Sequence, residues 1–481
     1  MTRRAETLAL LRDYESRNIT FVDPDGSWPI VWERARGVFV WDTEGRQYLD
    51  LTAAFGVAAA GHANPEVVRA GRRQMGRLLH AMGDVHPHAL KARLARELSR
   101  LTFERWGANP QLADGSEYGD PLPLTPSERE KHRPPAGKTR RPGKSESRPG
   151  ALSSPKGKTI FCNSGFEAVE AALKTAMLAT GKPGIIAFEG AYHGLGYGAL
   201  NATHREHFRS PFNSQLGRFG QFVPFPVAGA RFDLGRIEAR IRRLLRGGKI
   251  GAVLAEPVQA RGGVNVPPPE FLPMLRRLCS ERGALLILDE IYTGFGRTGK
   301  WFACEHWGVA PDLVCLGKAL TGGFPLSACV GRADLMDAAW PPSTGEAIHT
   351  STFLGHPVGC AMALAQLREI ESRELVSRGA GLGADLLARL SSLAAAAPRA
   401  RFTARGLGLL AGLEIRASNG APATEAALGV VKTMLQRGFI LLPEGGHAHV
   451  ISFTPPLTIT KRQLRETVEA LATALGAAEI R

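Results

Sequence analysis

The chain has 481 residues, of which 44% are hydrophobic and 22% charged; these values are typical of a folded protein of two or three domains and exclude a wholly disordered chain. The net charge of +15 raises the hypothesis of nucleic-acid binding, but residues 125–158 alone hold ten Lys/Arg against three Asp/Glu. The segment 107–157 is rich in Pro, Gly, Ser and charge, so we expect a disordered basic insertion there. No aromatic residue follows Tyr118 in this segment, so nucleic-acid binding by base stacking is not expected.

Residues 1–18 lack the continuous apolar stretch of a secretory signal and predict a helix with Leu8, Leu10 and Leu11 near one face. No run approaches the roughly 18 apolar residues of a membrane-spanning helix, so we expect no membrane partner. The six cysteines form no CxxC pair. We therefore expect reduced thiols in a cytoplasmic protein, with neither disulfides nor a metal site.

Before the insertion, the pattern predicts strands at 37–42 and 47–51 and helices at 67–79 and 89–101. After it, short apolar runs alternate with helical patterns. The predicted strands are 159–163, 185–188, 252–255, 284–288, 313–316 and 328–330. This alternation predicts an α/β fold with a mostly parallel sheet that helices cover on both faces. From about residue 360, long helices, short strands and a final helix predict a smaller α/β unit.

Two of the predicted strands end at residues that could bind a ligand. Ser164 and Glu167 follow the first strand after the insertion with the spacing of a capping box, and a capped helix start can bind an anion. Asp289 and Glu290 follow the strand 284–288. An acid at this edge of an α/β sheet can hold a metal ion or a protonated ring nitrogen. Taken singly, each feature has another explanation. Ser164 and Glu167 could simply cap a helix, and Asp289 and Glu290 could be a helix cap or surface acids.

Two further residues sit just beyond predicted strands. Lys318 follows the strand 313–316, where partial desolvation would lower its pKa and make its amine a nucleophile toward carbonyl groups. Tyr192 lies between glycines after the strand 185–188 and could stack on a planar ligand. A surface lysine and a packed turn tyrosine are the alternatives. Together, the four features match what pyridoxal 5′-phosphate requires: a phosphate site, a ring contact, an acid for the ring nitrogen and a lysine that forms a Schiff base.

Residues 37–459, apart from the insertion, resemble the class III, or omega, aminotransferases, which are pyridoxal-phosphate enzymes of fold type I. The matching motifs occur in family order: NSGFEAVEAALK at 163–174, AYHG at 191–194, EPVQ at 256–259, LDEI at 288–291, TGFGRTGK at 293–300, LGKAL at 316–320, GGFPLS at 322–327 and STF at 351–353. The resemblance implies a large cofactor-binding domain over 66–345. It also implies a smaller domain built from 346–481 together with residues 1–65.

The resemblance also implies roles for the cofactor site. Lys318 would form the Schiff base and move a proton during catalysis, and Asp289 would pair with the pyridinium nitrogen. Ile291 and Tyr192 would pack on opposite ring faces, with His193 alongside. The remaining contacts would be Ser164, Gly165 and Phe166 at the phosphate, Gln259 near the phenolic oxygen, and Thr352 at the phosphate of the neighbouring subunit of a homodimer with shared active sites.

Departures from the family pattern bear on the substrate. Phe166 stands where many members carry Ser or Thr, and Arg261 stands where they commonly carry an acid. Ser452 replaces an arginine that holds the α-carboxylate of glutamate in other members, where a residue equivalent to Glu256 pairs with it. Serine cannot form that bidentate pair. We therefore expect Glu256 to turn to Arg261 or to a cationic part of the substrate, and glutamate to be a poor amino donor.

These observations predict an enzyme that moves an amino group from an amine or (omega-)amino acid to a 2-oxo acid by a ping-pong mechanism. The alternative is a lyase or decarboxylase of the same family, because such enzymes start from the same cofactor complex. Phe55 is a candidate wall of the substrate pocket by analogy with the family, and a packed core aromatic explains it equally well.

Overall fold

The computed structural model describes residues 2–24, 26–109, 155–396 and 401–478. The predicted disordered insertion at 107–157 lies almost entirely outside these residues. Within the described ranges, no helix is both long and apolar enough to cross a lipid bilayer.

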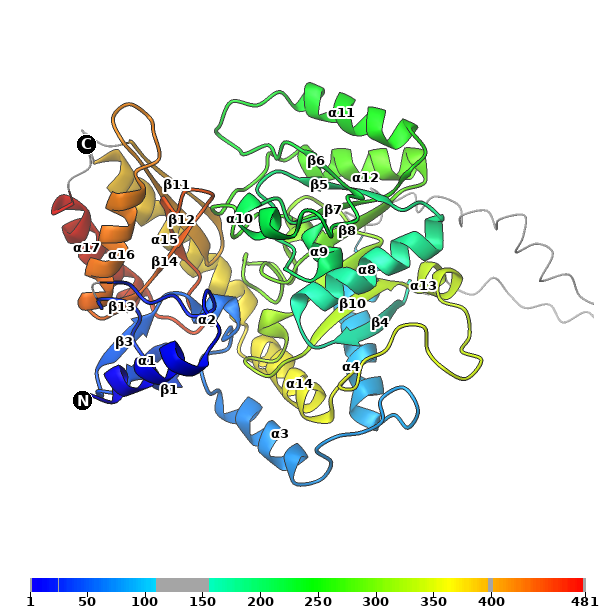
Figure 1. The fold of residues 1–481 in the computed structure, drawn as a ribbon, viewed down its shortest axis with the longest axis horizontal. Helices are drawn as coiled ribbons and strands as arrows, with labels where there is room; N and C mark the ends of the chain where they lie inside the picture. Colours follow the sequence, from blue (N-terminus) through cyan, green and yellow to red (C-terminus); the bar gives the residue numbers. More distant parts are fainter. Residues whose placement is uncertain (1, 25, 110–154, 397–400, 479–481) are drawn as a thin grey trace, which may run out of the picture.

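A seven-stranded sheet forms the centre of the larger part of the molecule (Figure 1). Its strands, in spatial order, are β4 (Gly157–Cys162), β10 (Ser327–Arg332), β9 (Leu313–Leu316), β8 (Leu285–Asp289), β7 (Ile250–Ala255), β5 (Gly184–Phe188) and β6 (Gly220–Val223). The strands from β9 to β6 are parallel, as predicted. Only β10 runs antiparallel to its neighbours. The connection from β9 to β10 is too short for the helical crossover that parallel strands need.

Helices cover both faces of this sheet because alternate residues of each strand point to opposite sides. In β8, Leu285 and Ile287 join the apolar cluster under α8, whereas Leu286 and Leu288 join the cluster on the other face. The first face carries α8 (Gly165–Thr180), α9 (Tyr197–Leu200) and α13 (Ala333–Ala339); the second carries α4 (Ala89–Ser99), α11 (Leu234–Arg246) and α12 (Phe271–Arg282). The sheet is therefore buried on both sides, which explains its continuous apolar runs.

N-terminal and C-terminal parts of the chain lie together beside this sheet (Figure 1). One small sheet has the order β1 (Trp32–Arg36), β2 (Phe39–Asp42), β3 (Gln47–Asp50) and β13 (Phe439–Ile440), and another has β11 (Arg401–Leu407), β12 (Leu410–Arg416), β15 (Val450–Phe453) and β14 (Leu442–Glu444). The parallel pairing of β3 with β13 joins N-terminal to C-terminal residues. The helices of this part are α15 (Leu375–Ala395), α16 (Thr424–Gln436) and α17 (Lys461–Gly476).

The domain boundaries at 65/66 and 345/346 stay predictions. Helix α14 (Pro357–Ser372), which lies within the predicted C-terminal domain, packs against α3 (Pro65–Met75), α4 and α15. At the N-terminus, α1 (Arg3–Tyr14) forms where a helix was predicted, but none of its residues is buried. The remaining short helices are α2 (Ala53–Gly56), a π-helix (Arg100–Glu104), α5 (Arg105–Gly107) and α10 (Glu206–Arg209).

Candidate active site

A cavity of about 320 Å³ lies at the carboxyl ends of the parallel strands, the edge at which open α/β sheets bind their ligands. Its lining comes from β8, the start of α8 and the loops after β5, β7 and β9. The lining residues are Gly165, Phe166, Tyr192, His193, Gly194, Leu195, Glu256, Val258, Arg261, Asp289, Ile291, Tyr292, Thr293 and Lys318. The cavity thus brings together most of the residues that the sequence singled out.

Asp289 ends β8 and is held in place on both carboxylate oxygens. Its Oδ2 lies 2.8 Å from His193 Nδ1, and its Oδ1 accepts a hydrogen bond from the Ile291 backbone N–H at 3.1 Å. Asp289 and His193 are both buried. The remaining ring nitrogen of His193, Nε2, is buried without a hydrogen-bond partner among the described residues. A buried carboxylate held in this way is suited to pair with a cationic group.

Lys318 begins a short 3₁₀ turn (Lys318–Leu320) directly after β9. Burial lowers the pKa of its amine below the usual lysine value, while nearby Asp289 opposes that shift. Its Nζ lies 4.9 Å from the centre of the Tyr292 ring. Its backbone has φ of 38°, a left-handed conformation that is uncommon for a residue with a side chain and is concentrated at functional sites. The amine of Lys318 therefore loses its proton, and becomes nucleophilic, at a lower pH than the amine of an exposed lysine.

The start of α8 forms an anion site. The Glu167 carboxylate accepts hydrogen bonds from the backbone N–H groups of Asn163 at 2.6 Å and Ser164 at 3.0 Å, which fixes the turn before the helix. The N–H groups of the first helical turn remain available for an anion. The Ser164 hydroxyl is buried without a hydrogen-bond partner among the described residues. A Cβ atom added at Gly165 would lie 3.0 Å from the Ile291 side chain, so glycine allows the helix start to approach the cavity.

Further charged groups line the cavity, namely Glu256 and Arg261, or lie beside it, as Glu444 does. Burial raises the pKa of Glu256 to about 7, and its Oε2 accepts a hydrogen bond from the Tyr192 N–H at 3.1 Å. The Arg261 guanidinium stacks 4.7 Å from the centre of the Tyr192 ring. Its Nε lies 3.6 Å from Glu444 Oε2, and burial raises the pKa of Glu444 to about 7. Of the two partners expected for Glu256, the structure places Arg261 beside Glu444 instead, and the other partner, a cationic part of the substrate, stays a prediction.

The contact between Arg261 and Glu444 is long and is not a hydrogen bond. Both Arg261 Nε and Glu444 Oε2 are buried and have no hydrogen-bond partner among the described residues. The distance of 3.6 Å between them is longer than a charge-assisted hydrogen bond. A ligand with a carboxylate or an ammonium group could satisfy these atoms better than they satisfy each other.

Five predicted site residues lie outside the cavity lining, and one of them is Ser164, directly before α8. Gln259 is buried, where its amide donates to the Glu189 carbonyl at 2.8 Å. Ser452 lies in β15 and donates its hydroxyl to the Leu442 carbonyl at 3.1 Å. Phe55 is 48% exposed, and Thr352 is exposed in the segment before α14. The roles predicted for these five residues stay predictions.

Five lining residues were not predicted as site residues, namely Gly194, Leu195, Val258, Tyr292 and Thr293, and neither was Glu444, which lies beside the lining. Tyr292 forms part of the wall beside Lys318, and burial raises the pKa of its hydroxyl to about 12. Its place directly after Ile291 could have been noticed. Glu444 lies on β14, far along the chain from every motif, and no local pattern marks it.

The described residues fit pyridoxal phosphate. The unpartnered Ser164 hydroxyl and the free amides of α8 match a phosphate group, and Asp289 matches a protonated ring nitrogen. Tyr192 and Ile291 line the space in which the ring would lie, and Lys318 supplies the amine for the aldehyde. Of the buried polar atoms without a partner, the Ser164 hydroxyl would gain one in the phosphate.

Comparisons with known proteins agree with this chemistry. The family model for class-III aminotransferases matches residues 21–110 and 150–475. A putrescine aminotransferase of Pectobacterium atrosepticum is 35% identical, with 95% of this chain and 86% of that protein covered. A 5-aminovalerate aminotransferase of Pseudomonas aeruginosa is 34% identical, with 92% and 93% covered. An acetylornithine aminotransferase of Methanosarcina mazei is 33% identical, with 93% and 92% covered.

Solved structures give the same result for the fold. The ornithine aminotransferase of Toxoplasma gondii superposes with a TM-score of 0.77 at 26% identity, covering 99% of this chain and 96% of that one. An (S)-enantioselective omega-transaminase of Thermomicrobium roseum superposes with a TM-score of 0.79 at 27% identity, covering 98% of both chains. The chain therefore belongs to the class-III aminotransferases and is a pyridoxal-phosphate-dependent enzyme that transfers an amino group to a 2-oxo acid.

Proposed function

We propose that the amino donor is a compound with a terminal primary amine and that glutamate is a poor donor. The observation that carries this proposal is the pair formed by Arg261, which lines the cavity, and Glu444, which lies beside Arg261, with Ser452 buried outside the cavity lining. Glu444 and Glu256 offer carboxylates to a cationic substrate, and Arg261 offers a guanidinium to the carboxylate of an oxo acid. The names of the relatives support a terminal-amine donor, because putrescine and 5-aminovalerate both carry one.

We assign the cofactor-binding roles as follows. The Ser164 hydroxyl and the N–H groups of Gly165 and Phe166 hold the phosphate, and Asp289 holds the ring nitrogen with its charge. His193 is a positioning residue, because its Nδ1 fixes the Asp289 carboxylate at 2.8 Å. Bound pyridoxal phosphate supplies an aldehyde that captures amines and a ring that withdraws electrons.

Lys318 carries the proton transfer. Its lowered pKa favours the neutral amine more than in an exposed lysine, and a neutral amine can accept the proton from the substrate carbon that bears the nitrogen and later return it. Tyr292 and the buried walls keep water away from that amine. Ile291 and Tyr192 restrict the plane in which the reacting bonds lie.

We propose a cytoplasmic homodimer in which the active sites are shared. Large apolar side chains near the cavity remain exposed in the single chain, including Phe55, Leu195 and Phe353, and such a surface is typical of an interface. Thr352 lies in the same exposed stretch as Phe353 and would reach the phosphate of the neighbouring subunit. The six cysteines are buried free thiols, which suits a reducing compartment.

The alternative, a lyase or decarboxylase, has no support from the putrescine, 5-aminovalerate and acetylornithine aminotransferases that this chain resembles. A half-reaction separates the two chemistries. The cofactor-loaded protein is mixed with putrescine, 5-aminovalerate, N-acetylornithine or glutamate, without any oxo acid. We expect one equivalent of aldehyde product per site from a terminal amine and little product from glutamate. Repeated release of ammonia or carbon dioxide would replace the aminotransferase assignment for this chain, and equal reaction of glutamate would overturn the proposed donor class.

A further inference from the structure

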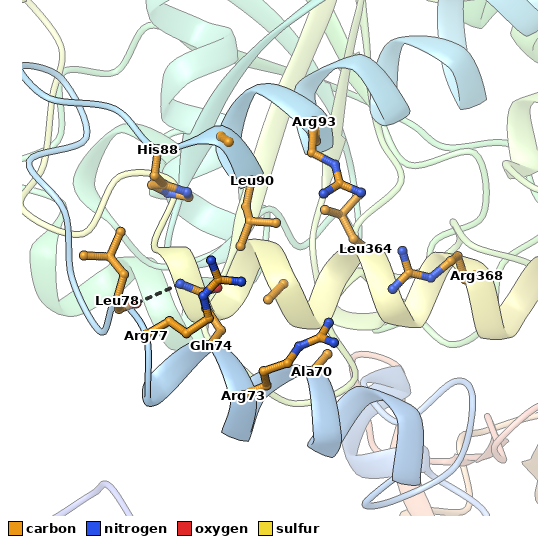
Figure 2. A pocket seen from close by; sticks show the side chains of 12 residues that line it. Ala70, Arg73, Gln74, Arg77, Leu78, His88, Leu90, Arg93, Leu364 and Arg368 are labelled. Atoms are coloured by element: carbon orange, nitrogen blue, oxygen red, sulfur yellow. Dashed lines mark hydrogen bonds between the residues drawn. The ribbon is translucent and has the colours of Figure 1, made fainter.

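A second cavity lies away from the active site, between α3, α4 and α14 (Figure 2). Its volume is about 400 Å³, and none of its lining residues also lines the active-site cavity. The lining consists of Ala70, Arg73, Gln74, Arg77, Leu78, His88, Ala89, Leu90, Arg93, Ala361, Leu364 and Arg368. The cavity therefore combines four arginines with an apolar floor and contains no Asp or Glu.

The four arginines come from separate parts of the chain. Arg73 lies on α3, Arg77 follows that helix, Arg93 lies on α4 and Arg368 lies on α14. Figure 2 shows the guanidinium groups of Arg73, Arg93 and Arg368 reaching toward the same space. Packing of α14 against α3 and α4 thus gathers the charges. The cluster of four arginines therefore arises from the packing of three helices. It does not come from a single charged stretch of sequence.

None of these four guanidinium groups makes an ion pair or a hydrogen bond with another described residue. An adjoining cavity of about 510 Å³ shares Arg73 and Arg368 with this one and does contain acids. Those acids have other partners: Glu66 pairs with Arg69 at 3.0 Å, Glu371 with Arg100 at 3.0 Å and Glu369 with Arg373 at 3.5 Å. Positive charge at the four arginines is therefore left without an internal counter-charge in the described residues.

We propose that this cavity binds a small molecule with at least two phosphate groups. A guanidinium fork matches a phosphate oxygen pair in geometry and charge, and four forks around one space can hold two phosphates. The apolar floor of Leu90, Leu364 and Ala361 gives room for an organic part. A volume of about 400 Å³ falls in the range of small-molecule sites.

The test is calorimetric titration of the cofactor-loaded enzyme at about 0.15 M salt, where long-range attraction to a basic protein is screened. The probes are tripolyphosphate, ATP and citrate. We expect tripolyphosphate and ATP to bind at one site per chain, and citrate to bind much more weakly. Tighter binding of ATP than of tripolyphosphate would show that the apolar floor takes an organic group, and the reverse order would identify an inorganic polyphosphate. Binding of citrate as tight as that of tripolyphosphate would overturn the assignment to phosphate.

Variants locate the binding site. Arg73→Gln and Arg368→Gln each remove one charge-assisted contact, so we expect about tenfold weaker binding from each. The matched control is Arg462→Gln, which removes an exposed arginine on α17 and leaves the affinity unchanged. Wild-type affinity in both pocket variants would overturn the proposal. All these arginines are exposed, so folding should persist; Arg93→Gln on α4 provides a third variant should one of the first two fail to fold.

Discussion

The Nδ1 atom of His193 lies 2.8 Å from the Oδ2 atom of Asp289, and both side chains are buried in the wall of the active-site cavity. The two residues are 96 positions apart in the sequence and come from the loop after β5 and the end of β8. The contact fixes the direction in which the Asp289 carboxylate faces. The orientation of Asp289 therefore depends on the packing of the sheet, which brings the AYHG and LDEI motifs together. Neither motif fixes it alone.

Asp289→Asn removes the negative charge that we assign to the ring nitrogen while it keeps the size of the side chain. We expect kcat to fall by at least about 100-fold, by analogy with the loss of one preorganised electrostatic contact. His193→Gln should cause a smaller loss, because it leaves the charge in place and disturbs only its orientation. Single-turnover rates with a saturating donor measure both effects. An Asp289→Asn variant with a wild-type rate would contradict the assigned role.

The pH dependence of donor binding should follow Glu444. Its raised pKa of about 7 means that the carboxylate is charged above that pH and neutral below it. A cationic diamine should therefore show a rising KM as the pH falls from 8 toward about 6. Glu444→Gln should give a high KM with little pH dependence across the same range. A steep pH dependence that persists in Glu444→Gln would assign the titration to another group, with Glu256 the nearest candidate because its pKa is also about 7.

Arg261→Gln should act on the oxo acid rather than on the diamine. Loss of a charge-assisted contact to the carboxylate costs about 1.5–3 kcal/mol, which corresponds to a roughly tenfold to 100-fold lower kcat/KM for the 2-oxo acid. The kcat/KM for putrescine should fall by less, because this donor has no carboxylate. Measuring the two half-reactions separately provides the internal control. Equal losses in both half-reactions would show that Arg261 only maintains the shape of the cavity.

Ser452→Arg tests why glutamate should be a poor donor. Ser452 pairs with Leu442 across β14 and β15, so its side chain lies on the same sheet face as that of Glu444. An arginine placed there would sit near the active-site end of the sheet. We expect a gain in kcat/KM for glutamate, accompanied by a loss of stability of about 1–3 kcal/mol from the larger buried side chain. A folded variant with no gain for glutamate would count against the hypothesis.

Gly194 should tolerate no side chain. Its φ is 106°, and an added Cβ would lie 2.3 Å from the Cβ of Phe166 at the start of α8. Gly194→Ala should therefore lower the free energy of unfolding by more than about 1 kcal/mol and weaken retention of the cofactor. Gly381→Ala is the matched control: this helical glycine has no atom within 4 Å of an added Cβ, and alanine there should be neutral or slightly stabilising. Thermal unfolding of both variants, with and without cofactor, checks the pair.

The sequence predicted the sheet strands well, because a continuous apolar run in an α/β chain is buried on both faces wherever the strand lies. The runs at 185–188 and 313–316 became β5 and β9 with almost unchanged bounds. The antiparallel direction of β10 was not predicted, since direction depends on the length of the connection rather than on composition. Helix α1 formed as predicted, but without burying Leu8, Leu10 or Leu11, because periodicity indicates a possible apolar face and not a partner for it.

By itself the sequence determined the residue types of the chemistry: Lys318, Asp289 and Ser164 each follow a strand, and strand ends meet at one sheet edge. The tertiary structure decided which of these groups face one another. It gave Arg261 the carboxylate of Glu444 rather than that of Glu256, and it gathered Arg73, Arg93 and Arg368 around one cavity. The physical reason is distance along the chain. A local pattern fixes the strand or helix on which a residue lies, whereas burial and the pairing of charges depend on which distant elements pack together.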